Sequence, residues 1–177
     1  GEMMVEPSAA TDVFAIDTWG STGDGKKPAL RSGFPVDLAI RRSTAGGNVS
    51  LASRLTGGGY FRVNTTNQEA YDQVVFDYNN GYYSATDTSA AFHSYMWKRA
   101  KGFMDVVAYT GVSGSPQVIN HSLGVTPEMI WTKSRSTTGR WLVLHKDLTY
   151  ALAVQTDGAE TGSIQINTPT STSFTAA

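Results

Sequence analysis

The sequence predicts an all-β fold made of two tandem β-sandwich-like units that arise from an internal repeat, the second of them incomplete. Two observations lead to this prediction. Short runs of β-branched and aromatic residues are separated by Gly, Asn, Ser, Thr and Pro along nearly the whole chain, which is the pattern of strands and turns. Several of these runs return about 93 residues later.

The repeat consists of five blocks that recur in the same order. Repetition at a fixed period indicates tandem copies of one structural unit. Modules in series are more typical of scaffolds and adhesins than of single-site enzymes. The matched blocks are 12–16 with 105–109, 35–38 with 127–129, 42–46 with 135–139, 51–56 with 144–149, and 63–65 with 154–156.

The repeat also predicts the domain organisation. We expect a leader or linker over residues 1–11, a first sandwich unit over 12–102 and a C-terminally incomplete second unit over 103–177. The Thr- and Ser-rich end of the second unit, residues 168–177, stops where a second hairpin should begin. A sheet that lacks its last strands has unpaired edges, so either the natural protein continues or a neighbouring chain supplies the pairing.

The expected strands follow from the spacing of apolar runs and turn residues. Asn80-Gly81 predicts a tight type I′ turn in a hairpin over 74–84, because both residues tolerate positive φ angles. The run 91–98 has aromatic residues on both faces, which favours a central strand. The full set is 12–17, 36–42, 49–53, 59–66, 72–78, 82–86, 91–98, 103–110, 117–121, 127–134, 141–146, 150–156 and 163–167.

Composition excludes several classes of protein. The net charge of −1 gives no electrostatic reason to expect nucleic acid or an anionic membrane as a partner. The chain has no cysteine, so disulfides and thiolate metal sites are excluded. No stretch approaches 18 apolar residues, so no membrane insertion is expected. Charged residues make up only 16%, and the hydroxyl and amide side chains that replace them suit an extracellular or virion β-protein.

Motifs for chemistry are weak throughout the chain. The segment 20–27 nearly matches a phosphate-binding loop, but Lys27 replaces the hydroxyl residue that would hold magnesium, and Pro28 follows where a helix should begin. The three histidines, His93, His121 and His145, lie at no zinc-ligand spacing. We therefore expect no catalytic residues, no metal and no cofactor. A polysaccharide depolymerase would need two convergent carboxylates, and spacing pairs none of Asp72, Asp77, Glu128 and Asp147.

Aromatic residues near turns and strand ends are the best candidates for a binding surface, because aromatic faces stack against sugars and other apolar partners. The alternative is that most of them fill the core. The candidate platforms are Trp19, Tyr82, Tyr83, Trp131 and Trp141, with Tyr60 in a similar setting.

The second unit carries a recognisable set of short sequence motifs, at residues 103–111, 118–130, 133–136 and 141–146. Together they resemble the repeat module of tail, fibre and other virion structural proteins of marine tailed bacteriophages, cyanophages among them. The segment 95–103 resembles the junction between two such modules. The resemblance covers residues 91–157 well and 12–66 weakly. It implies a β-sandwich-like unit placed on a virion and transfers no catalytic residue.

The resulting expectation is a non-enzymatic virion structural or host-contact module, such as part of a tail fibre or surface protein. It would be synthesised in the host cytoplasm and located on the extracellular particle. Its expected partners are other virion proteins and further copies of itself, with a trimer favoured. The alternative is a lectin-like carbohydrate-binding module that recognises bacterial surface glycans.

Overall fold

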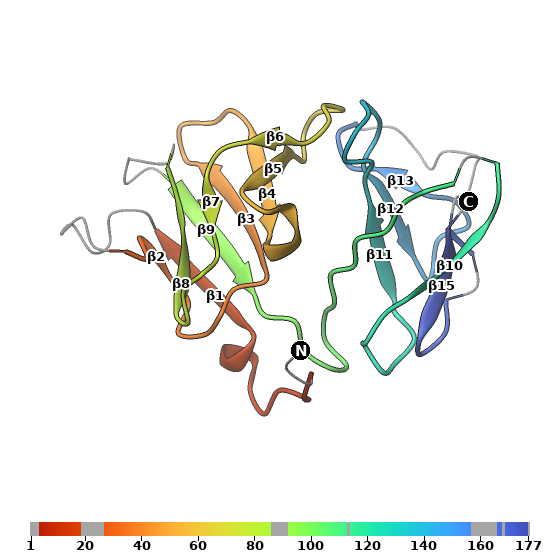
Figure 1. Cartoon of the computed structure of the whole chain (residues 1–177), viewed down its shortest axis with the longest axis horizontal. Coiled ribbons are helices and arrows are strands. Elements are labelled where there is room, and N and C mark those ends of the chain that lie inside the picture. Colours follow the sequence, from red (N-terminus) through yellow and green to blue (C-terminus); the bar gives the residue numbers. More distant parts are fainter. Residues whose placement is uncertain are drawn as a thin grey trace.

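The computed structural model describes residues 4–18, 27–85, 92–112, 114–156, 166–167 and 169–176. Within these residues the fold is all-β, as predicted, and consists of antiparallel strands with two short 3₁₀ turns, η1 (Ala10–Asp12) and η2 (Arg54–Thr56) (Figure 1). Neither of these turns could span a membrane.

The first half of the chain forms two sheets. The larger is six-stranded, in the order β1-β9-β3-β4-β5-β6, and the smaller has the order β2-β8-β7. The strands are β1 (Phe14–Thr18), β2 (Leu30–Arg31), β3 (Leu38–Ser43), β4 (Val49–Ser53), β5 (Gly59–Arg62), β6 (Ala70–Tyr71), β7 (Val74–Val75), β8 (Gly81–Ser84) and β9 (Phe92–Trp97).

The second half forms two three-stranded sheets, in the orders β11-β12-β13 and β10-β15-β14. All of these strands lie on the other side of the molecule from β1–β9 (Figure 1). They are β10 (Gln117–Asn120), β11 (Met129–Thr132), β12 (Leu142–His145), β13 (Leu152–Ala153), β14 (Ile166–Asn167) and β15 (Ser173–Ala176).

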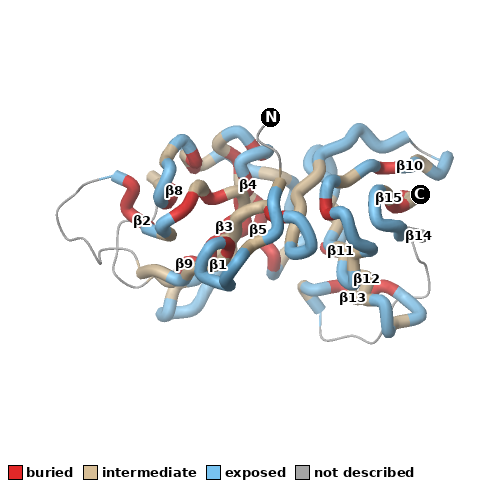
Figure 2. Tube along the Cα trace, turned by 90° about the horizontal axis from the view of Figure 1, so that it is seen from below, coloured by how far each residue is buried: buried red, intermediate tan, exposed pale blue. Residues whose placement is uncertain are grey.

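The main core lies between the two sheets of the first half. Alternate residues of the large sheet, such as Ala39, Ala52 and Met96, pack against Leu30 and Tyr82 of the small sheet. This alternation follows from the two-residue period of a strand. Figure 2 shows buried stretches among these strands of the first half, and further buried stretches among the strands of the second half.

Two polar contacts are built into this core. The Arg41 guanidinium binds the Asp72 carboxylate, with Nη2 and Oδ2 2.8 Å apart and both side chains at most 10% exposed. The hydroxyls of Tyr82 and Ser94 are hydrogen-bonded at 2.7 Å, which satisfies the one polar group of the fully buried tyrosine.

The second half has a smaller core. Ile119 of β10 and Phe174 and Ala176 of β15 are buried, and Ile130 and Leu144 from the facing sheet pack against them. Elsewhere in the described part of this half, Leu123, Val143, Ala151 and Ala153 are buried as well. A unit of this size buries a low fraction of its surface, so packing against the first half adds to its stability.

Three strand predictions need correction. The range 103–110 forms no strand and contains only an isolated bridge between Ala100 and Met104. The Thr- and Ser-rich end does form a hairpin, β14–β15, so the prediction that this segment stops before the hairpin is wrong. The short strands β2 and β6, and β15 of the C-terminal hairpin, were not predicted. The predicted positions 86, 91 and 163–165 lie outside the described residues.

The hairpin over 74–84 exists, but its turn differs from the predicted one. Val74 pairs with Ser84 and Val75 with Tyr83, so the connection is longer than two residues. Gln73 is the only non-glycine residue of the described ranges with a positive φ, so Asn80 does not adopt the type I′ geometry. Gly81 is needed for another reason, because a Cβ there would lie 2.0 Å from the Leu30 carbonyl oxygen of the neighbouring strand.

Candidate functional site

The two halves meet at Trp141, which directly precedes β12. Its indole is buried against Leu51, Phe61 and Val63 of the first half. The ring meets Phe61 edge-on at 5.4 Å between centroids, and its Nε1 donates a hydrogen bond of 3.1 Å to the Arg62 carbonyl. A residue of the second half therefore covers the outer face of the first half's large sheet.

An ion pair joins the same two halves beside Trp141. The Arg135 guanidinium forms two hydrogen bonds to the Glu69 carboxylate, one of them 3.0 Å from Nη2 to Oε1. The Glu69 amide in turn donates to the Arg135 carbonyl at 3.0 Å. These hydrogen bonds and the charge attraction of Glu69 outweigh desolvation and raise the pKa of Arg135 above its ordinary value.

The loop that carries Arg135 is itself held in place. The Lys133 ammonium donates hydrogen bonds to the carbonyls of Ser134 and Thr137, and partial burial lowers the pKa of Lys133 below its ordinary value. At the other end of the loop, the Gly139 amide donates to the Thr66 carbonyl at 2.8 Å. Main-chain and side-chain bonds together fix this loop against the first half.

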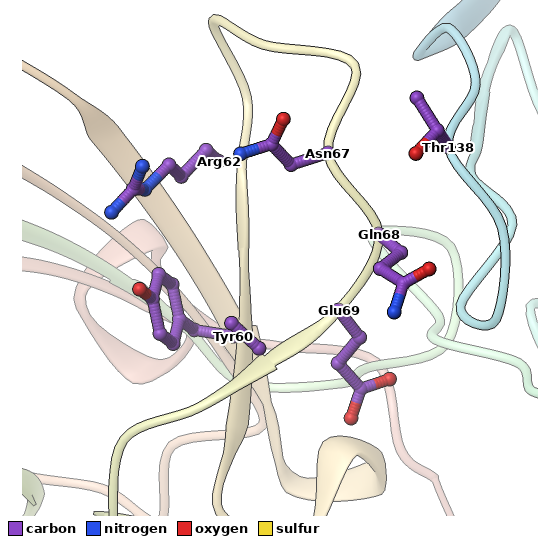
Figure 3. A pocket seen from close by; sticks show the side chains of 7 residues that line it. Tyr60, Arg62, Asn67, Gln68, Glu69 and Thr138 are labelled. Atoms are coloured by element: carbon purple, nitrogen blue, oxygen red, sulfur yellow. The ribbon is translucent and has the colours of Figure 1, made fainter.

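A pocket of about 340 Å³ lies along this junction. Figure 3 shows Thr138 approaching it from the second half, opposite Asn67, Gln68 and Glu69. A second hollow of about 320 Å³ shares Glu69 with the first and includes Arg135. The first pocket combines an aromatic ring with amide, carboxylate, guanidinium and hydroxyl groups, and its lining residues are Tyr60, Arg62, Asn67, Gln68, Glu69, Ala70 and Thr138.

A second exposed surface lies on β11. Met129 and Trp131 are 51% and 41% exposed, and they point to the same side of the strand. The Trp131 Nε1 lies 2.9 Å from the Met129 sulfur, and its ring is 6.3 Å from that of Trp141 in an edge arrangement. This pair forms an apolar surface beside the junction.

The structure places the predicted aromatic platforms in different environments, some buried and some exposed. Tyr82 is fully buried and stacks on Phe76, and Trp141 is buried at the junction, so the platform prediction is wrong for both. Tyr83 is half-buried, with the Lys27 ammonium 4.2 Å from its ring centroid. Trp131 is exposed and lies beside Trp141. Trp19 lies outside the described residues, as does most of the near-match to a phosphate loop at 20–27.

Sequence reasoning missed the polar residues that line the junction. Asn67, Gln68 and Glu69 lie in an irregular segment between β5 and β6 and come together with Thr138 only through the packing of the two halves. The one local signal is the polar run from Asn64 to Glu69 directly after a strand, and such a run also fits an ordinary loop.

Three of the four carboxylates considered in the sequence lie beside basic groups. Asp72 binds Arg41, Glu128 lies 3.0 Å from the Lys146 ammonium, and Asp147 lies 3.5 Å from the His145 ring nitrogen. The hydrogen bond and charge of Glu128 raise the pKa of Lys146 above its ordinary value. Across the described ranges, no three His, Asp or Glu residues come together in a way that could hold a metal ion.

Comparison with known proteins gives one match. Neither the curated proteins nor the solved structures contain a significant relative. A family model described as a domain of unknown function, DUF7483, matches residues 43–177. The match begins at the last residue of β3 and includes both sides of the junction. Since it spans well over half of the chain, the protein belongs to the DUF7483 family.

Proposed function

We propose that the protein is a non-enzymatic structural or host-contact module of a bacteriophage particle that acts through assembly and surface binding. Two features of the chain support this proposal. The sequence motifs at 103–111 and 118–130 resemble the repeat module of phage virion proteins. The chain also carries two similar β-units joined by a packed tryptophan and a doubly hydrogen-bonded ion pair.

The observation that carries the proposal is the concentration of exposed apolar side chains on the second half. Exposed apolar side chains gain stabilisation when another molecule covers them. Among the described residues, most of the exposed large apolar side chains follow residue 102: Phe103, Tyr109, Val112, Val118, Val125, Met129, Trp131, Tyr150 and Val154. The small core of this half gives it a further reason to bury surface against neighbours.

Light scattering over a concentration series tests this role. A closed assembly, with a trimer favoured, should have a mass that is a multiple of the 19.0 kDa chain. The double variant Val118→Lys with Val154→Lys should weaken association at least about tenfold, because burying the added charges costs more than about 1.4 kcal/mol. The matched control, Val5→Lys with Ile16→Lys, adds the same charges to exposed sites of the first half. A monomer at all concentrations would contradict an assembly role.

A second candidate function is carbohydrate binding, and the junction pocket favours it. Tyr60 offers a ring face, and Asn67, Gln68 and Glu69 supply donors and acceptors for hydroxyl groups, which is the combination that sugar recognition uses. The buried Trp141 donates to the carbonyl of the pocket residue Arg62, so ligand binding should alter its fluorescence.

Titration with a panel of bacterial surface glycans tests this candidate. A saturable change in tryptophan fluorescence is expected, and Gln68→Ala should weaken binding about tenfold, since it removes hydrogen bonds worth about 1.4 kcal/mol. Asn120→Ala is the matched control, because Asn120 is an exposed amide on β10, away from the pocket lining. A flat titration across the panel, or equal effects of both variants, would count against glycan binding.

A further inference from the structure

Positive charge is concentrated where the two halves meet. Two segments lie against each other there, residues 62–69 of the first half and 133–140 of the second, joined by the hydrogen bond from the Gly139 amide to the Thr66 carbonyl. Whereas the whole chain has 14 basic and 15 acidic residues, these segments contain four basic residues and one acidic residue: Arg62, Lys133, Arg135 and Arg140, with Glu69. The junction is therefore a basic region on a protein that is otherwise net acidic.

The one acidic residue of these segments is already paired. Both carboxylate oxygens of Glu69 accept hydrogen bonds from the Arg135 guanidinium. A paired carboxylate repels an approaching anion less than a free one, because the charge of the nearby cation offsets its own. The junction pocket consequently keeps an excess of positive charge, although Glu69 is one of its lining residues.

Arg62 carries the positive charge that is available to a ligand. It lines the pocket with Tyr60, and Figure 3 shows both side chains on the same side of β5, as the two-residue period of a strand requires. In the described part of the chain, the Arg62 guanidinium has no ion-pair or hydrogen-bond partner. The nearby Arg41, which lies over the same tyrosine ring, is held by Asp72 instead. Since a guanidinium offers two parallel N–H groups that match a carboxylate, Arg62 is suited to bind one.

The neutral groups of the pocket favour a sugar over a simple anion. Asn67 and Gln68 offer amide donors and acceptors for hydroxyl groups. Thr138 adds a hydroxyl, and Tyr60 adds a ring face. The volume of about 340 Å³ suits a small organic ligand rather than an inorganic ion. The second hollow, of about 320 Å³, shares Glu69 with the first, so a ligand of several sugars can extend from one to the other.

We propose that the junction pocket binds an acidic glycan, with the carboxylate of a uronic acid on the Arg62 guanidinium. Hydroxyl groups of the same sugar bind Asn67 and Gln68, and the basic loop 133–140 attracts the rest of the glycan chain. The inference rests on the carbohydrate-binding candidate and names the class of glycan that the pocket takes.

Titration of the full chain with matched pairs of glycans tests the proposal. The probes are bacterial surface oligosaccharides that contain uronic acid, each beside its carboxyl-reduced form, which keeps the sugar rings and linkages but loses the charge. Calorimetry should show saturable binding of acidic members and at least about tenfold weaker binding of their reduced forms, since charge-assisted hydrogen bonds are lost. Added salt should weaken binding of the acidic form, because ions screen exposed charges.

Arginine variants make the test specific to the pocket. Arg62→Gln should abolish the preference for the acidic form and leave binding of the reduced form unchanged, whereas Arg62→Lys should keep part of the preference, because it retains the charge without the paired donors. Arg42→Gln is the matched control. Arg42 is exposed on the opposite face of the sheet, since Arg41, Ser50 and Arg62 lie in one cross-strand row. Equal effects of Arg62→Gln and Arg42→Gln would overturn the proposal.

The outcomes also separate this inference from carbohydrate binding itself. Equal affinity for the acidic and reduced forms would keep glycan binding and overturn the inference. Binding of poly-glutamate or oligothymidylate as tight as that of an acidic glycan of equal charge would show attraction of any anion, and would overturn it as well. Absence of binding by acidic, reduced and neutral glycans alike would reject both.

Discussion

Replacing Trp141 with alanine is expected to lower the free energy of unfolding by about 3–5 kcal/mol, which is the usual cost of removing a large buried aromatic side chain. The indole is 4% exposed, contacts Leu51, Phe61 and Val63, and donates a hydrogen bond to the Arg62 carbonyl. The variant would lose these contacts and leave a cavity between the two halves. Urea unfolding followed by circular dichroism measures the loss.

Trp131→Ala provides the matched control for this prediction. Trp131 is also a tryptophan of the second half and contacts Trp141, but 41% of it is exposed. Removing this side chain should lower the free energy of unfolding by about 1 kcal/mol or less, because little additional apolar surface becomes exposed to water. Similar costs for the two variants would contradict the buried position of Trp141 at the junction.

Asp72→Ala is expected to have an effect of similar size, about 3–5 kcal/mol. Removing one partner of a buried ion pair leaves the other charge in the interior with less compensation. The Arg41 guanidinium is 6% exposed and lies against the Tyr60 ring as well as the Asp72 carboxylate. Chemical denaturation of the Asp72→Ala variant measures this loss in the free energy of unfolding.

A double-mutant cycle with Arg41→Met distinguishes the ion pair from simple loss of packing. The double variant should recover much of the loss, since an apolar pair of similar volume often replaces a buried ion pair without penalty. Glu128→Ala is the exposed control, and its pair with Lys146 should contribute about 1 kcal/mol or less. Strictly additive costs for Arg41 and Asp72 would show that the two charges do not stabilise each other.

The local sequence pattern predicted several strands, including one whose two partners, β1 and β3, lie far away in the chain. The range 49–53 coincides with β4, and 91–98 contains β9, which proves central as expected from its two apolar faces. The errors come from pairing. The run 103–110 has strand-forming residues but makes no ladder, and β15 forms within a Ser- and Thr-rich segment because it pairs with β10 and β14.

The candidate site was less predictable because its residues are joined only by tertiary contacts. Glu69 and Arg135 are 66 residues apart, and nothing in their local sequences pairs them. Tyr82 and Trp141 lie near turns, as exposed platforms often do, but proximity to a turn does not reveal what covers a ring. Burial of Trp141 depends on Leu51 and Phe61, which belong to the other half of the chain.

The position of Trp141 has a consequence for how the chain folds. A side chain from one half completes the packing of the other, so the unit that was duplicated in the sequence is not the unit that folds cooperatively. Cutting the chain at residue 102 would expose Leu51, Phe61 and Val63 on one fragment and the Trp141 ring on the other. The halves should therefore unfold in a single transition, with the repeat boundary lying inside one foldon.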